Sequence, residues 1–186
     1  LQVVVGNATA ATGFDVLVYE RDALLNWTQL NPGLYSGVQD VRPLPDLSLG
    51  GAAFAELRGT GAAKTLALSV ASVNGVATVD TLLTGNITGF DAIARNSGTG
   101  GYVLFTHSDG SHVYLQLWDS SRSPGNQVST IAGPNTFSTP TDSLNIDKSC
   151  IAAYPQLALL PDGVLVSWQE RCSSAAGWRM AARVVR

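Results

Sequence analysis

The sequence predicts an all-β protein, built as a β-propeller-like array of about four antiparallel blades. Composition gives the first two observations: charged residues make up only 13% of the chain, and there are 19 glycines. A helical domain covers its outer faces with Lys and Glu, but this chain has only two lysines and three glutamates. The third observation is a unit of short strands that recurs along the chain, which favours a repeat architecture.

The clearest copy of this unit lies near the C-terminus, between Tyr154 and Arg171. Apolar stretches there are separated by Pro, Asp and Gly, which favour a tight turn. The predicted elements are a first strand over 152–160, a turn at Pro161-Asp162-Gly163, a second strand over 163–170 and a third strand over 178–185.

Three fainter copies precede this unit. A glycine opens the second strand of each copy: Gly13, Gly51, Gly101 and Gly163. Fourth strands are predicted over 76–83 and 127–132, and a unit of roughly 40–50 residues with four short strands is the size of a propeller blade. The chain is therefore predicted to be a single repeat domain, or a fragment of a larger propeller, with approximate units 1–37, 38–89, 90–149 and 150–186.

The second strands are apolar on both faces at 16–19 and 164–166. Such strands are expected between two neighbouring layers, whereas a half-exposed strand alternates. A β-sandwich also contains many short strands with Gly and Pro turns, so it is the alternative fold. The last unit has no candidate fourth strand, and a neighbouring segment is expected to complete it. The chain opens at Leu1 without Met or a leader pattern, so we expect a processed product or an excerpt of a longer polypeptide.

The turn Leu160-Pro161-Asp162-Gly163 lies between two apolar strands, the second of which ends in Trp168. This combination resembles the loose repeats of secreted bacterial and algal propeller-type proteins. The resemblance covers the whole chain in outline, but only 154–171 carries it clearly, and it identifies no single family. It implies a propeller-type fold.

The two cysteines flank the last hairpin: Cys150 precedes its first strand and Cys172 follows its second. If Leu160 pairs with Gly163 across the turn, the cysteines come within one residue of facing each other. Opposed Cβ atoms on neighbouring strands lie ~4.5–5.5 Å apart, near the separation that a disulfide needs. A Cys150–Cys172 disulfide is therefore predicted, with two buried free thiols as the alternative. A disulfide indicates an oxidising compartment.

Three segments fit the acceptor pattern for N-glycosylation: Asn7-Ala8-Thr9, Asn26-Trp27-Thr28 and Asn86-Ile87-Thr88. Asn7 and Asn86 are predicted in turns and Asn26 on a strand, and all three side chains could face outward. Together with the disulfide, the pattern predicts a secreted or cell-surface protein. In a bacterial protein these matches would be accidental.

The two histidines, His107 and His112, flank a Ser-Asp-Gly-Ser segment that contains Asp109. Two imidazoles and a carboxylate could bind a metal such as zinc. Asp-Gly is, however, above all a turn signal, so the sequence favours a solvated hairpin end. No metal site and no cofactor are predicted.

Glu20, Glu56 and Glu170 end the second strands of their units, and we interpret them as a repeated structural feature. Glycoside hydrolysis needs two carboxyl groups placed across a cleft, and no such pair can be assigned, so no catalytic residue is predicted. The Glu20-Arg21 and Glu170-Arg171 pairs are expected to contact neighbouring blades. The tryptophans are interpreted mainly as packing groups, although exposed Trp can stack on sugars: Trp27, Trp118, Trp168 and Trp178.

The net charge of -3 and the absence of a basic stripe exclude a nucleic-acid partner. No apolar run approaches the ~18 residues of a membrane span. We expect a non-enzymatic extracellular structural or interaction module of a larger secreted or cell-surface glycoprotein, such as a subunit of a surface filament or matrix. Its partners would be other protein chains, remaining blades of the same polypeptide, or glycans. The alternative is a propeller-type carbohydrate-active hydrolase or a lectin.

Overall fold

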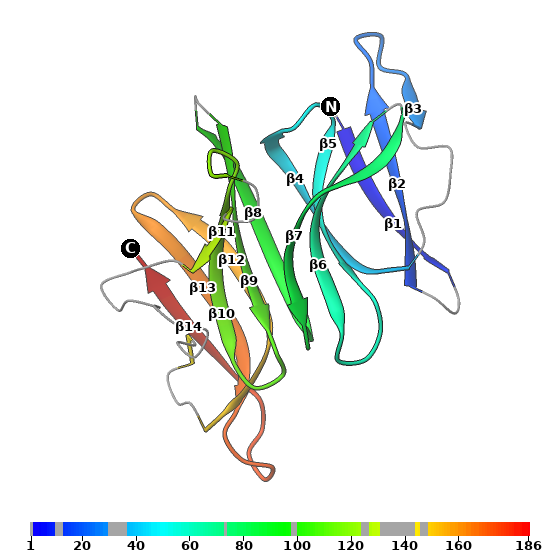
Figure 1. Ribbon diagram of the computed structural model, residues 1–186. Helices are drawn as coiled ribbons and strands as arrows, with labels where there is room; N and C mark the ends of the chain where they lie inside the picture. The colour runs from blue at the N-terminus through cyan, green and yellow to red at the C-terminus, as the bar shows by residue number, and fades with distance from the viewer. Residues whose placement is uncertain are drawn as a thin grey trace. The chain divides into compact units, whose positions relative to one another are not determined.

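The computed structural model describes residues 2–9, 13–29, 37–72, 74–97, 100–123, 127–130, 144–145 and 149–186 (Figure 1). These residues form fourteen strands and no helix, so the predicted all-β class is confirmed. Accordingly, the described part of the chain contains no helix that could cross a membrane. The chain divides into two compact units, Leu1–Gly85 with Ala94–Asn96 and Asn86–Ile93 with Ser97–Arg186.

The first unit contains one antiparallel sheet in the order β1-β2-β4-β5-β6-β7, with β3 paired to β2. A single residue pair, Phe14 with Val38, joins β2 to β4. The sheet therefore consists of two meanders, β1–β3 and β4–β7. Its strands are β1 Gln2–Thr9, β2 Gly13–Arg21, β3 Trp27–Gln29, β4 Val38–Ser48, β5 Ala52–Arg58, β6 Lys64–Ser72 and β7 Gly75–Gly85.

Strand β5 lies at the centre of the second meander and is buried at every position from Ala52 to Leu57. On one face, Phe54 and Ala52 pack with Val38 and Ala71. The opposite face of the strand carries Ala53, Ala55 and Leu57 and is entirely apolar. Glu56 lies on the same face as Phe54. An apolar strand buried on both faces is the arrangement that such a sequence favours.

The second unit contains a four-stranded sheet in the order β11-β10-β9-β8 and a three-stranded sheet in the order β12-β13-β14. The predicted strands over 152–160, 163–170 and 178–185 correspond to the last three. Of the predicted fourth strand over 127–132, residues 131–132 lie outside the described residues. The strands of this unit are β8 Gly89–Ser97 (apart from 94–96), β9 Gly100–Ser108, β10 Val113–Asp119, β11 Val128–Thr130, β12 Ile151–Leu160, β13 Gly163–Arg171 and β14 Arg179–Val185.

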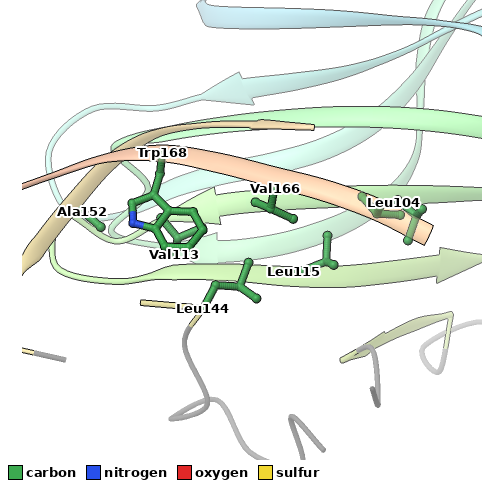
Figure 2. Packing of buried hydrophobic residues seen from close by; sticks show 8 residues of the cluster. Leu104, Val113, Leu115, Leu144, Ala152, Val166 and Trp168 are labelled. Atoms are coloured by element: carbon green, nitrogen blue, oxygen red, sulfur yellow. The ribbon is translucent and has the colours of Figure 1, made fainter. Parts of the chain in front are cut away.

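The two sheets of the second unit share one hydrophobic core (Figure 2). Alternate residues of β13 enter it, and Trp168 at its centre is completely buried. Leu104 of β9, Val113 and Leu115 of β10, and Leu144 pack against this side. The intervening residues of β13 are only half-buried, so this strand alternates, unlike the two-sided burial predicted for it.

Candidate functional site at the disulfide-bonded hairpin

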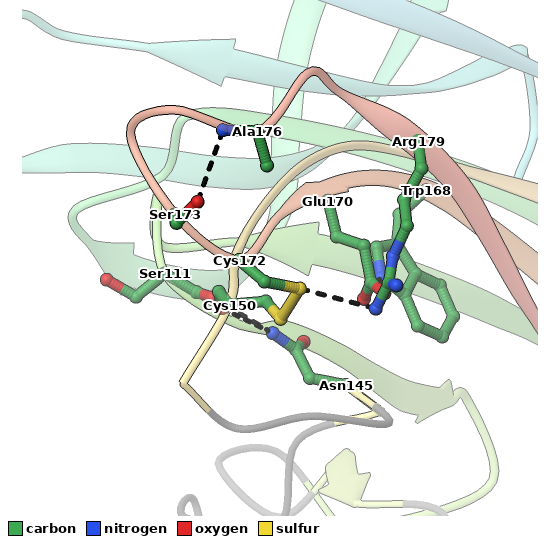
Figure 3. The surroundings of a disulfide bond; sticks show 9 residues. All are labelled: Ser111, Asn145, Cys150, Trp168, Glu170, Cys172, Ser173, Ala176 and Arg179. Carbon is green, nitrogen blue, oxygen red and sulfur yellow. Dashed lines mark hydrogen bonds and ion pairs between the residues drawn. A yellow bond between two sulfur atoms is a disulfide. The ribbon is translucent and has the colours of Figure 1, made fainter.

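The hairpin β12–β13 is closed at its base by a disulfide between Cys150 and Cys172, which confirms the predicted pairing (Figure 3). The two Cα atoms are 3.9 Å apart, and the bond spans 22 residues of sequence. Pairing of Leu160 with Gly163 begins the hairpin at the predicted turn. The bond therefore fixes the end of the hairpin that lies opposite this turn.

A β-bulge brings the cysteines directly opposite each other. Between Ala153 and Gln156 the register of β12 shifts, because two residues of β12 face the single residue Trp168 of β13. One of the two, Tyr154, has a φ of 54°, and the other is Pro155. Proline lacks the N–H that a regular ladder would use, so a bulge on an edge strand accommodates it. Sequence reasoning did not predict the bulge.

Asn145 anchors the chain just before the disulfide, and sequence reasoning missed it. Its side chain is almost fully buried and forms three hydrogen bonds. The amide nitrogen donates to the carbonyl oxygens of Cys150 (3.1 Å) and Ser111 (3.0 Å). The amide oxygen accepts from the backbone N–H of Val113 at 2.9 Å. An isolated Asn in a polar segment gives no sequence signal for such a role.

The carboxylate of Glu170 lies buried beside the disulfide (Figure 3). Its Oε1 accepts hydrogen bonds from Nε and Nη2 of Arg179, and its Oε2 accepts one from the indole N–H of Trp168 at 3.1 Å. Nη2 of Arg179 also lies 3.2 Å from Sγ of Cys172. Glu170 thus pairs with the adjacent strand of its own sheet, which corrects the expectation that the Glu170-Arg171 pair contacts a neighbouring blade.

Glu56 is the second buried glutamate of the described residues. Its Oε1 accepts a hydrogen bond from the hydroxyl of Ser69 at 2.5 Å, and its Oε2 lies 3.1 Å from Nε of Arg58. Burial raises the pKa of Glu56 to about 7, while the Ser69 hydrogen bond acts in the opposite direction. Glu56 and Glu170 are therefore both buried beside an arginine. The side chain of Glu20 lies outside the described residues.

An exposed arginine–tryptophan platform lies next to the disulfide. Arg171 is the last residue of β13, and its Cζ lies 5.2 Å from the ring centroid of Trp178, just before β14. Trp178 is 46% exposed. The pairing of Glu170 with Arg179 places Arg171 across from Trp178 in the same ladder. A cation above an indole face is a favourable contact that also orients the ring.

The first unit repeats this construction. Arg21 ends β2, Trp27 begins β3, and the two residues are direct partners in the ladder. Cζ of Arg21 lies 5.9 Å from the ring centroid of Trp27, which is 48% exposed. Trp118 and Trp168, by contrast, are buried. The interpretation of the tryptophans as packing groups is thus wrong for Trp27 and Trp178. The repeated Glu-Arg followed six or seven residues later by Trp was the sequence signal for these platforms.

The loops that follow the two arginines are held by short-range hydrogen bonds. Asp22 Oδ1 accepts from the backbone N–H groups of Leu24 and Asn26, at 2.8 and 2.9 Å. In the last hairpin, Ser173 Oγ accepts from the backbone N–H of Ala176 at 3.1 Å. Side-chain oxygens that cap tight loops in this way fix the entry of the next strand. Each tryptophan therefore follows an ordered turn.

His107 is buried, so the predicted solvated hairpin end is wrong for this histidine. His107 is only 7% exposed, pairs with Tyr114 across the β9–β10 ladder and stacks on its ring at 4.9 Å between centroids. Burial lowers the pKa of His107 to about 4, and the charge of Asp109 acts in the opposite direction.

Asp109 is fully engaged as the cap of this turn. Its Oδ1 accepts from the backbone N–H groups of Ser111 and His112, and its Oδ2 accepts from the Tyr114 hydroxyl at 3.0 Å. Burial by itself would raise its pKa, but these hydrogen bonds hold the pKa below the ordinary value. The segment is therefore organised as a turn and not as a set of convergent ligands.

Among the described residues, one set of three potential metal ligands lies close together: Cys150, Glu170 and Cys172. Its two sulfur atoms are bonded to each other, and its carboxylate faces the guanidinium of Arg179. Cysteine binds zinc as a thiolate, and a glutamate binds it through a carboxylate that is free to coordinate, so this set is a structural cluster.

The three glycosylation sequons lie in different settings. Asn26 precedes β3 in an exposed turn, which corrects its predicted place on a strand, and its amide donates to Asp22 Oδ2 at 3.1 Å. Asn86 is exposed and donates to the carbonyl oxygen of Asp109 at 2.7 Å. Asn7 lies on β1, which corrects its predicted place in a turn, and its side chain is outside the described residues. Glycosylation of these residues stays a prediction.

The hairpin and the strand that follows it thus join a structural disulfide, an ion pair with a buried carboxylate and an exposed aromatic platform on one short segment of chain. The disulfide and the ion pair fix the backbone, and the platform presents Trp178 and Arg171 to solvent. Comparison with protein-family models, with curated proteins and with solved structures finds no match for this chain.

Proposed function

We propose that this chain is a non-enzymatic interaction module of a larger secreted or cell-surface glycoprotein, such as a subunit of a surface filament or matrix. The observation that carries the proposal is the disulfide between Cys150 and Cys172, directly beside the exposed platform of Arg171 and Trp178. A disulfide that closes a hairpin persists in oxidising compartments. An exposed, oriented Trp with an Arg is typical of residues that anchor binding partners.

The sequons support the same compartment. Asn26 and Asn86 are both exposed at turns, where an oligosaccharide can be attached without displacing packed side chains. In both cases the side-chain amide has a second N–H, so the observed hydrogen bond does not occupy every donor.

For the fold, we propose a propeller-like array of antiparallel blades. Support comes from the consecutive order of the strands: β4–β7 and β8–β11 are each four-stranded, and β5 is buried on both faces. A β-sandwich accounts for the same sheets equally well. The last sheet has three strands in the described residues, so a propeller would require a fourth strand from another segment or chain.

The carbohydrate-active hydrolase is the less favoured alternative. The Glu170 carboxylate is held by Arg179 and the indole of Trp168, and Glu56 lies against Arg58 and Ser69. A catalytic acid and base must instead face each other across a substrate. The lectin alternative is favoured by one specific observation, the exposure of Trp27 and Trp178.

Localisation in the source cells tests the proposal. Antibodies raised against the chain should label cells without permeabilisation, and the labelled protein should carry Cys150 and Cys172 protected from alkylation until a reductant is added. In a eukaryotic source, its mass should fall after enzymatic removal of N-glycans. Recovery of the chain inside the cell, with both thiols alkylated directly, would show that the extracellular assignment is wrong.

A further inference from the structure

The outer face of the sheet β12–β14 carries exposed aromatic and apolar side chains that could contact a ligand. Side chains alternate along a strand, so Trp178 and Met180 lie on the face opposite to the buried Trp168 and Glu170. Trp178 is 46% exposed and Met180 is 66% exposed. Gln169 lies directly opposite Met180 in the ladder and therefore on this same face.

The platform is held in place by the protein itself. The guanidinium of Arg171 lies over the indole of Trp178, and the next residue, Cys172, is fixed by the disulfide. Ser173 caps the turn that leads to β14. Preformed groups lose little conformational entropy when a ligand binds.

The charge around this platform differs in sign from that of the whole chain. The segment 151–186 contains four arginines and two acids, a net charge of +2, whereas the complete chain carries -3. Both acids are engaged: Glu170 pairs with Arg179, and Asp162 pairs with Arg186 at 2.9 Å. By the register of β13 and β14, Arg179 and Arg183 lie on the core side of the sheet, so the cation that its outer face offers to an anion beside Trp178 is Arg171.

We propose that the platform formed by Arg171 and Trp178 binds an anionic carbohydrate, a saccharide that carries carboxylate or sulfate groups. The apolar C–H face of a pyranose ring packs on the indole. The guanidinium of Arg171 donates hydrogen bonds to the anionic group, and the amide of Gln169 is placed to bind hydroxyl groups. The inference rests on the proposed extracellular function and names the ligand class.

The platform of Arg21 and Trp27 provides a matched control within the same chain. It has the same arginine–tryptophan construction and similar exposure of the indole. Its charge is opposite, since the segment 13–29 holds three acids and one arginine, a net charge of -2. An anionic saccharide is therefore expected to avoid it.

Titration calorimetry of the complete, oxidised chain tests the inference. The probes are a hexasaccharide of galacturonic acid, its fully methyl-esterified neutral form, and a sulfated hexasaccharide, so that carboxylate and sulfate ligands are distinguished. Trp178→Ala should weaken binding of the preferred anionic probe by about tenfold. Arg171→Gln should weaken it by a similar factor of about ten and abolish the preference over the neutral ester. Trp27→Ala should stay within about twofold of the wild type.

Three results would overturn the inference. One is no binding of either anionic probe by the wild type, and another is equal affinities for the wild type and Trp178→Ala. A third is an equal loss in Trp27→Ala, which would show that any exposed indole suffices. Trp178→Phe keeps an aromatic ring and should retain part of the affinity, and equal melting temperatures exclude misfolding. The localisation of the protein does not depend on this binding. A failure of the carbohydrate proposal can therefore be distinguished from a failure of the proposed extracellular function.

Discussion

The buried carboxylate of Glu170 forms an ion pair with the largely exposed guanidinium of Arg179 at the edge of the core. Oε1 of Glu170 accepts hydrogen bonds from Nε at 2.9 Å and from Nη2 at 2.7 Å of Arg179. The Glu170 side chain is 1% exposed, whereas that of Arg179 is 60% exposed. A carboxylate buried without a cation is strongly destabilising, so Arg179 allows Glu170 to occupy the core beside Trp168.

Replacing Arg179 with Met should lower the free energy of unfolding by about 2 kcal/mol, because it leaves a buried acceptor and charge without partners. Urea denaturation at neutral pH measures the change. Arg186→Met is the matched control, since its pair with Asp162 is about two-thirds exposed on both sides and should contribute less than about 0.5 kcal/mol. Equal effects of the two substitutions would contradict the role given to Arg179.

The disulfide should contribute about 3 kcal/mol to stability, because it closes a loop of 22 residues in the unfolded chain. Urea midpoints of the oxidised protein and of the Cys150→Ser/Cys172→Ser double variant measure this difference. Peptide mapping without reductant should recover the two cysteines in one cross-linked fragment. If a reductant leaves the midpoint of the wild type unchanged, the hairpin base does not depend on the bond.

Two glycines that precede or open the second strands of their predicted units should not accept a side chain without a loss of stability. A Cβ on Gly163 would lie 2.4 Å from the carbonyl oxygen of Val185, and one on Gly51 would lie 2.3 Å from that of Ala71. Because both contacts are with backbone, Gly163→Ala and Gly51→Ala should each destabilise by about 1–3 kcal/mol. Thermal unfolding of Gly177→Ala serves for comparison, since no atom lies within 4 Å of its Cβ position. A shift in that variant as large as in the others would refute the steric explanation.

The contribution of His107 to the stability of the protein should fall between about pH 6.5 and pH 4. Burial lowers its folded-state pKa to about 4, while the unfolded value is 6.5. At this position the unfolded chain therefore binds a proton first as the pH falls, and the full contribution of His107 is present only above the unfolded pKa. The loss should reach about 3 kcal/mol at the lower end of this range.

His107→Phe isolates this contribution, because Phe keeps the stacking on Tyr114 but does not titrate. Urea unfolding of both proteins at several pH values gives the difference. Taking this difference in stability removes the effects that both proteins share. One such effect is that of Glu56, whose raised pKa increases stability as the pH falls from 7 to 4.5. Parallel stability curves for the two proteins would show that His107 is not the group responsible.

The pairing of the cysteines shows how much of the strand register can be predicted from the sequence. The turn at Pro161-Asp162-Gly163 predicts the register near the tip of the hairpin, and that register left Cys150 and Cys172 one residue out of alignment. The bulge at Tyr154 and Pro155 removes this offset. Pro155, which lacks the N–H of a regular ladder, was a local signal for a bulge, but the resulting register depends on how β12 pairs with β13.

Local strand patterns and turn residues are enough to predict the β class, the last hairpin and the partner of each cysteine. Which polar and aromatic groups are buried, by contrast, depends on the packing of the folded sheets. Trp168 and Trp178 lie on the same hairpin and its neighbouring strand, yet one is buried and the other is 46% exposed. The face of a strand that meets a second sheet depends on packing between segments far apart in sequence, and side-chain alternation then assigns every residue of that strand to the core or to solvent.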